Sequence, residues 1–163
     1  MQIPFNKPHL TGKETHYMYE AVHEGKLSGN GKFTKRCQHW FESRYGFKKT
    51  LLTTSGTDAL EMCAMLCGLQ PGDEVIVPAN TYIATILAIT ENGLVPVLVE
   101  PRQDTLQIDD SLIEERITDR TKAICIVHLY GRLACTQHIL DLCEKYGLKL
   151  IEDNAQAHGC TMP

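Results

Sequence analysis

Several short apolar segments of this sequence end in small, hydroxyl-bearing or charged residues that could take part in chemistry. The first of these segments is followed by Ser55, Gly56 and Thr57, directly before a stretch with helical spacing. Free backbone N–H groups at a helix start, a small glycine and two hydroxyl groups could together bind a phosphate. Ser55 or Thr57 could equally be a simple N-cap, which is a common role for both residue types.

Aromatic and ionisable side chains follow the later apolar segments. The ring of Tyr82 could stack on a flat ligand, although packing in a core is the commoner role of a tyrosine, and for His128 we expect a structural role. Asp153 ends the last segment, where burying its carboxylate is costly without a cationic partner. A phosphate site, a stacking aromatic and a strand-end carboxylate together describe a site for pyridoxal 5'-phosphate (PLP), whose ring nitrogen the carboxylate would keep protonated.

The elements that position these residues follow a regular alternation. We predict strands at 50–54, 74–78, 95–99, 123–127 and 149–152, and helices at 57–67, 81–91, 110–116 and 136–146. Short strands rich in Val, Ile and Leu between helices predict an α/β fold, with a mostly parallel sheet and helices on both faces. Ligands of such sheets bind at the carboxyl ends of the strands, which is where the candidate residues lie.

The N-terminal part has a different character. Two segments with helical spacing, 13–24 and 33–45, flank a polar loop that contains two glycines. We find no internal repeat and no linker. We therefore predict one domain over 1–163, in which 1–47 form a helical arm with a substrate loop and 48–163 form a βα core.

Composition and charge exclude several classes of protein. The 163 residues are 43% hydrophobic, enough for one domain with a core, and the net charge of −4 comes from scattered residues. This argues against nucleic acid or an anionic membrane as a partner. There is neither a signal-like N-terminus nor an apolar run of about 20 residues, so we expect a cytoplasmic protein. The seven cysteines, without CxxC spacing, are interpreted as reduced core thiols, and no metal site is expected.

In this order, the motifs resemble the DegT/StrS family of PLP-dependent sugar-nucleotide aminotransferases. The matching stretches are 27–31, 54–60, 71–78, 81–82 and 151–159. The resemblance covers nearly the whole chain. It implies the aspartate-aminotransferase fold (PLP fold type I), of which this chain would be an incomplete N-terminal portion of the large domain.

The resemblance also assigns roles to residues. With Ser55 beside them, Gly56 and Thr57 would hold the cofactor phosphate, and Tyr82 would stack on the pyridine ring. Asp153 would pair with the ring nitrogen, and Gln156 would lie near the 3-hydroxyl group. The loop that would face the substrate consists of Leu27, Ser28, Gly29 and Asn30.

By the same resemblance, the complete enzyme would take a nucleotide-linked keto sugar and an amino donor, and a homodimer is plausible. Residues 26–38 are most similar to transaminases that make dTDP-4-amino-4,6-dideoxygalactose. Residues 127–131 instead resemble enzymes that aminate a 3-keto-6-deoxyhexose. The keto position therefore stays open.

The chain departs from the family in length. Family members are more than twice as long, and their Schiff-base lysine would lie past residue 163, so no catalytic residue is assigned and we expect this chain alone to be inactive. The two strands that would join 50–54 to the last strand also come later. We therefore expect 50–54 either to pair beside the last strand or to be covered by dimer contacts.

Two other interpretations stay open. The chain could be a non-catalytic module that binds PLP or a nucleotide sugar, or one half of a split enzyme. A dinucleotide-binding Rossmann domain fits the alternation in general. It is disfavoured because the sequence lacks GxGxxG after the first strand and an acidic residue at the end of the second.

Overall fold

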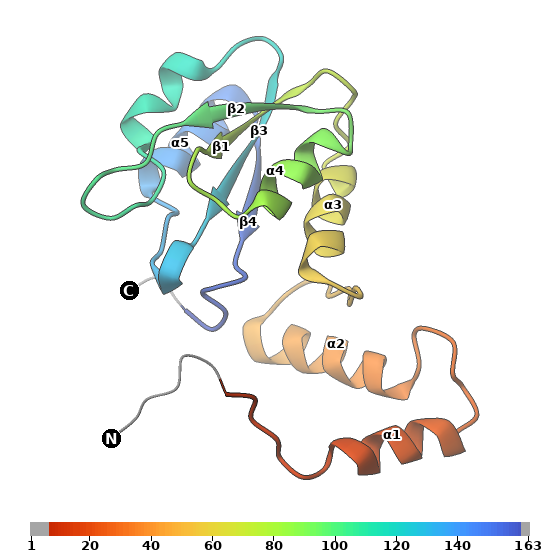
Figure 1. Cartoon of the computed structure of the whole chain (residues 1–163). Coiled ribbons are helices and arrows are strands. Elements are labelled where there is room, and N and C mark those ends of the chain that lie inside the picture. The colour runs from red at the N-terminus through yellow and green to blue at the C-terminus, as the bar shows by residue number, and fades with distance from the viewer. Residues whose placement is uncertain (1–6, 161–163) are drawn as a thin grey trace, which may run out of the picture. The chain divides into compact units, whose positions relative to one another are not determined.

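A computed structural model of the chain describes residues 7–160 (Figure 1). The chain divides into two compact units, and the boundary falls between Leu52 and Thr53. None of the helices within 7–160 is both long and apolar enough to cross a membrane.

The first unit contains two helices, α1 (Glu14–His23) and α2 (Lys32–Tyr45), which confirm the two predicted helical segments. Helix α2 ends at Gly46, whose φ of 72° is the left-handed conformation that glycine adopts without strain. Neither helix has a fully buried residue. The order of this unit therefore comes from contacts between partly exposed side chains rather than from a closed core.

The second unit is built on a parallel sheet of four strands in the order β2-β1-β3-β4. The strands are β1 (Glu74–Pro78), β2 (Val95–Val99), β3 (Thr121–Val127) and β4 (Lys149–Asp153). In the centre of the sheet, Ile76 is in register with Val97 on one side and Ile124 on the other. Four of the five predicted strands, and their parallel arrangement, are confirmed.

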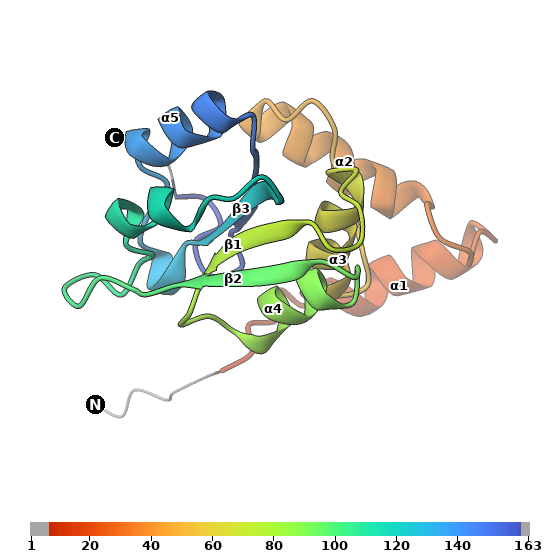
Figure 2. The same ribbon diagram turned by 90° about the horizontal axis from the view of Figure 1, so that it is seen from above.

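Three α-helices cover the sheet: α3 (Gly56–Leu66), α4 (Ile83–Thr90) and α5 (Gln137–Tyr146). Figure 2 shows α3 and α4 on one face and α5 on the other, as the sequence predicted. Three short 3₁₀ helices complete the unit: η1 (Asp110–Leu112), η2 (Glu114–Arg116) and η3 (Leu129–Gly131). The predicted helix at 110–116 is thus two separate 3₁₀ turns.

The core has two layers because side chains alternate along β1. Val75 and Val77 pack with Ala64 of α3 and Ile89 of α4, whereas Ile76 packs in the opposite layer, which includes residues of α5. All five residues of β1 are buried. A strand buried on both faces reads as a continuous apolar run, which explains why this strand was predictable.

The predicted strand at 50–54 is wrong: this segment has no strand structure and does not pair with β4. A strand exists only through its hydrogen-bonded neighbours, and those implied by the resemblance lie past 163. The amide of Thr50 instead donates to the carboxylate of Glu42 (3.0 Å), and the hydroxyl of Thr53 donates to the carbonyl of Ser55 (2.7 Å). The expected re-pairing does not occur, and cover by dimer contacts stays a prediction.

All seven cysteines are free thiols, but only some of them lie in the core. Cys125 and Cys135 are buried as predicted, and desolvation raises the pKa of the Cys125 thiol to about 12. The prediction is wrong for Cys37, Cys63 and Cys160, which are exposed. Cys37 lies on α2, which has no buried residue, Cys63 lies on an exposed position of α3, and Cys160 lies in the loop after β4.

The amino ends of the strands are joined by a buried carboxylate. Glu74, 4% exposed at the start of β1, accepts hydrogen bonds from the hydroxyl of Thr118 (2.6 Å) and from Nη2 of Arg120 (2.6 Å). A third bond comes from the hydroxyl of Thr121 (3.2 Å). The Thr118 hydroxyl, the Arg120 charge and the Thr121 hydroxyl lower the pKa of Glu74, against the opposing effect of burial.

We predict that Glu74→Gln destabilises the chain at pH 7 by about 1–3 kcal/mol, because it leaves the same shape without the charge that these donors stabilise. The folded-state pKa of Glu74 is lowered, so its contribution is present above the unfolded pKa of about 4.3 and is lost as the pH falls through the lower value. Urea unfolding at pH 7 and at acidic pH measures both effects. Glu144→Gln, at an exposed position, is the control; equal effects of the two changes at pH 7 would contradict the prediction.

Candidate active site

A cavity of about 320 Å³ opens at the carboxyl ends of the strands in the second unit. Its walls come from the start of α3, the start of α4, and the segments that end or follow β3 and β4. The lining residues are Gly56, Thr57, Leu60, Tyr82, Ala84, Val127, Leu129, Asp153, Ala155 and Gln156. The volume is typical of a small-ligand site, and five of the six predicted cofactor residues take part in the lining.

The start of α3 forms one end of this cavity. Ser55, the sixth predicted residue, is the N-cap, and its hydroxyl accepts a hydrogen bond from the amide of Asp58 (3.1 Å). The amides of Gly56 and Thr57 have no acceptor within residues 7–160. A Cβ at Gly56 would meet no atom within 4 Å. Neither packing nor backbone conformation requires glycine there, so the space at this helix start is free for an anionic group.

The carboxylate of Asp153 lies at the end of β4 and is 7% exposed. Its Oδ2 accepts from the hydroxyl of Thr85 (2.9 Å), and its Oδ1 accepts from the amide of Ala155 (3.2 Å). Within the described part of the chain, no cation forms an ion pair with it. A buried carboxylate that lines a cavity without a counter-ion fits a ligand with a protonated nitrogen.

The remaining two predicted cofactor residues present an aromatic ring and an amide. Tyr82 precedes α4 and is 73% exposed, so its ring does not serve as core packing in this chain. Gln156 accepts a hydrogen bond at Oε1 from the amide of Tyr130 (2.7 Å). The ring offers a flat apolar surface, and the amide offers N–H groups, beside the carboxylate of Asp153.

His128 does not belong to the lining. It is 4% exposed, its Nδ1 accepts from the amide of Ala134 (3.0 Å), and its Nε2 lies 2.9 Å from a carboxylate oxygen of Glu152. Because Nδ1 is the acceptor, the proton of the neutral ring sits on Nε2 and is donated to Glu152. Both ring nitrogens are engaged, which agrees with the expected structural role.

The four predicted substrate residues lie in the first unit, in the loop between α1 and α2, and all are exposed. Leu27 is 76% exposed, and Asn30 has a φ of 60°. The walls of the cofactor-sized cavity come entirely from residues 53–163, so Leu27, Ser28, Gly29 and Asn30 form no part of it.

Sequence reasoning missed Thr85, the hydroxyl partner of Asp153, and the apolar part of the lining. Thr85 is 1% exposed within α4, and its hydroxyl also lies 2.9 Å from that of Thr81. The available signal was a threonine inside an otherwise apolar helix, since a buried hydroxyl needs a partner. For Leu60, Val127 and Leu129 no local signal exists, because apolar residues fill core and cavity walls alike.

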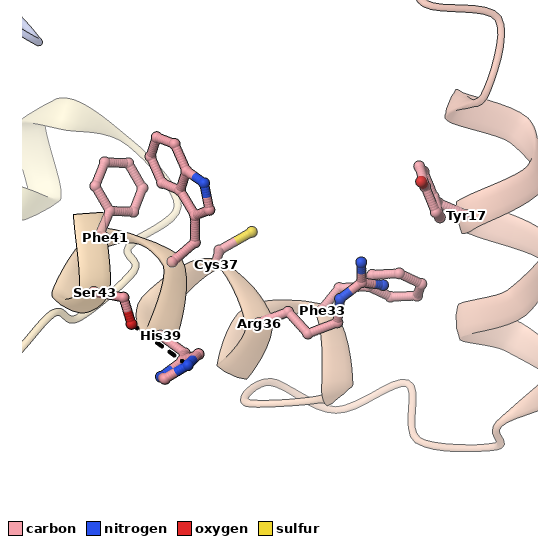
Figure 3. A pocket seen from close by; sticks show the side chains of 8 residues that line it. Tyr17, Phe33, Arg36, Cys37, His39, Phe41 and Ser43 are labelled. Carbon is pink, nitrogen blue, oxygen red and sulfur yellow. Dashed lines mark hydrogen bonds between the residues drawn. The ribbon is translucent and has the colours of Figure 1, made fainter.

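A second, larger hollow of about 710 Å³ lies within the first unit (Figure 3). Its lining residues are Tyr17, Phe33, Arg36, Cys37, His39, Trp40, Phe41 and Ser43. Figure 3 shows Tyr17 on α1 and the others on α2, with a hydrogen bond between Ser43 and His39 (3.4 Å). The guanidinium of Arg36 stacks over the ring of Phe33 at 5.4 Å. Its lining contains no Asp or Glu, in contrast to the smaller cavity, which is lined by Asp153.

The parallel α/β unit corresponds to part of the large domain of PLP fold type I, the fold of the solved structures to which the chain is similar. Comparison with protein families gives the same result, because the model of the DegT/DnrJ/EryC1/StrS aminotransferase family matches residues 8–163. The chain belongs to this family.

Individual relatives make the comparison more specific. The chain is 53% identical over 119 residues to dTDP-3-amino-3,6-dideoxy-α-D-galactopyranose transaminase of Aneurinibacillus thermoaerophilus, covering 73% of this chain and 33% of the relative. It is 39% identical over 160 residues to GDP-perosamine synthase of Caulobacter vibrioides, covering 98% and 43%. The structure of NtdA from Bacillus subtilis with bound cofactor PMP superposes with a TM-score of 0.86 at 38% identity, covering 90% and 34%. The chain thus spans between 33% and 43% of the length of these relatives.

We predict that Thr85→Val destabilises the fold by about 1–3 kcal/mol, because the shape is kept while the buried carboxylate of Asp153 loses its hydroxyl donor. Thr90→Val is the matched control, since the hydroxyl of Thr90 is exposed at the end of the same helix and bonds only to carbonyls of that helix. Urea unfolding of both variants measures the difference. An equal cost for the two variants would show that the Asp153 contact contributes nothing specific.

Proposed function

We propose that this chain is the N-terminal part of a PLP-dependent aminotransferase that acts on a nucleotide-linked keto-deoxysugar. In this proposal the complete enzyme works in the cytoplasm as a homodimer and serves the biosynthesis of cell-surface polysaccharides or deoxysugars. The observation that carries the proposal is the buried carboxylate of Asp153, which lines a cavity without a counter-ion. The start of α3 has the opposite character, because its free amides can bind an anionic group.

The cavity offers complementary groups for the phosphate, the ring, the ring nitrogen and the 3-oxygen of PLP. The free amides of Gly56 and Thr57 would bind the phosphate, with Ser55 fixing the helix start that presents them. Tyr82 would cover one face of the ring, and Gln156 would face the 3-oxygen. The carboxylate of Asp153 would accept a hydrogen bond from the protonated pyridine nitrogen.

When bound, PLP supplies the electron sink on which transamination depends. Asp153 has to stay ionised and fixed to keep the ring nitrogen protonated. The hydroxyl of Thr85 and the amide of Ala155 hold its two oxygens and leave the cavity side open for that proton. Tyr82 would restrict the ring to one plane and would exclude water from one of its faces.

The substrate is a keto sugar carried by a nucleotide, because two relatives are named for dTDP-linked and GDP-linked amino sugars. The sugar in the name of the 53%-identical relative carries its amino group on carbon 3. This supports the 3-keto expectation drawn from residues 127–131 over the 4-keto one. The loop of Leu27, Ser28, Gly29 and Asn30 would contact the substrate.

None of the ten lining residues is a lysine, and no lysine follows Asp153 in the sequence. The cavity therefore offers no amine for a covalent bond to the cofactor. We propose that this chain alone holds PLP without such a bond and does not catalyse transamination.

The test is a titration of the purified chain with PLP, in which absorbance and induced circular dichroism report binding. The wild type is expected to bind, and Asp153→Asn is expected to bind about tenfold or more weakly, because a charge-assisted hydrogen bond is lost. Asp141→Asn, on α5 and bonded to Gln137, is the matched control and should bind as the wild type does.

Intact mass after borohydride reduction, with excess free lysine to suppress nonspecific adducts, checks the non-covalent mode. No stoichiometric adduct is expected. One adduct at a single lysine would show that another residue replaces the missing amine, and would contradict the inactive state of this chain. Equal affinities of the wild type and Asp153→Asn would contradict the cofactor site.

A further inference from the structure

One peptide group beside the cavity is held from both sides. Nε2 of Gln107 donates to the carbonyl oxygen of Leu129 (3.1 Å), and the amide of Tyr130 donates to Oε1 of Gln156 (2.7 Å). That carbonyl and that amide belong to the same trans peptide, in which the C=O and N–H bonds point in opposite directions. The two glutamines therefore hold opposite sides of a single group, the Leu129–Tyr130 peptide, and Gln107 shares the carbonyl with the amide of Arg132 (3.1 Å).

This peptide orientation is unfavourable for Tyr130. Its φ is 57°, in the left-handed region that residues other than glycine avoid, and its side chain is 70% exposed. A half-turn of the Leu129–Tyr130 peptide would return Tyr130 to a negative φ. It would also place the carbonyl oxygen against Oε1 of Gln156 and the amide against Nε2 of Gln107. The two glutamine contacts thus oppose the relaxation of the backbone.

The presence of a buried amide side chain at position 107 is not explained by a contribution to the stability of the fold. It is 6% exposed, and its Oε1 has no hydrogen-bond partner in the described part of the chain. A buried amide with an unused acceptor costs free energy, and an apolar side chain of similar size would avoid that cost. The contact that this amide makes is the one to the Leu129 carbonyl, so its role lies in the orientation of the peptide.

The orientation decides what Gln156 presents to a ligand. Since Oε1 is occupied by the amide of Tyr130, the N–H₂ group is the part of the Gln156 side chain left to face the cavity. If the Leu129–Tyr130 peptide turned over, the carboxamide of Gln156 would have to turn as well, and would offer an oxygen instead. A donor in the cavity would become an acceptor.

We propose that Gln107 is a positioning residue, which acts through the Leu129–Tyr130 peptide to make Gln156 a hydrogen-bond donor toward the 3-hydroxyl oxygen of the cofactor. The identity of the ligand rests on the proposed function, whereas the orientation of the peptide does not. Gln107 and Gln156 thereby act as a unit, although they are far apart in the sequence and only Gln156 lines the cavity.

The first test uses the chain without PLP. In Gln107→Met, the amide of Tyr130 should exchange its hydrogen about tenfold faster than in the wild type, measured by NMR, because the peptide loses the Gln107 contact at its carbonyl and turns away from Gln156 more often. The thermal midpoint should be unchanged or higher, since the unpaired Oε1 is removed. Gln103→Met, at an exposed position of the same loop, should change neither quantity. Unchanged exchange at Tyr130 in Gln107→Met overturns the inference.

The second test measures PLP affinity. Gln107→Met and Gln156→Glu should each raise the apparent Kd for PLP about tenfold, since the first frees the Gln156 carboxamide to turn and the second replaces its N–H₂ group with an oxygen. Gln156→Glu still accepts from the Tyr130 amide, so the slow exchange of that amide should persist. A lowered thermal midpoint with unchanged affinity in Gln107→Met would show a purely structural role and overturn the inference. Absence of PLP binding by the wild type would overturn the proposed function alone, because the exchange result judges the peptide orientation without the cofactor.

Discussion

The parallel pairing of β1, β3 and β4 is the constraint on which the cavity depends. Parallel strands bring their carboxyl ends to one edge, so Tyr82 and Asp153 meet although 71 positions separate them. The pairing is stable because β1 is buried on both faces between two layers of apolar side chains. The position of each site residue is therefore fixed by core packing at a distance from the chemistry.

Sequence reasoning succeeded where the physical signal is local and repeated. The β1 segment is a buried apolar run with turn residues on both sides, and the four observed strands were all found from such runs. It failed at 50–54, where the residues favour a strand but no neighbour is present to form one. Strand propensity depends on the residues of one segment, whereas a strand forms only when that segment makes hydrogen bonds to a neighbouring strand.

The candidate site shows the same division. Residue types and order pointed to Asp153, Tyr82 and the start of α3, because a buried charge and an open helix start have recognisable chemical requirements. The supporting contacts were not predictable. Gln107 touches the site through the backbone of Leu129, and Thr85 reaches Asp153 from a different layer. Such contacts depend on loop geometry and on register, neither of which a single sequence specifies.

The sheet carries one buried acid at each end, and the two differ in how they are neutralised. Glu74 forms an ion pair with Arg120, whereas Asp153 has no cationic partner within residues 7–160. The folded state is therefore electrostatically complete at the amino ends of the strands and incomplete at the carboxyl ends. A ligand that binds only the folded state adds to its stability by an amount that rises with the logarithm of the free ligand concentration. If PLP is that ligand, as proposed, chains made while it is scarce would spend more time unfolded and be removed by proteases, and the abundance of this protein would follow the supply of PLP.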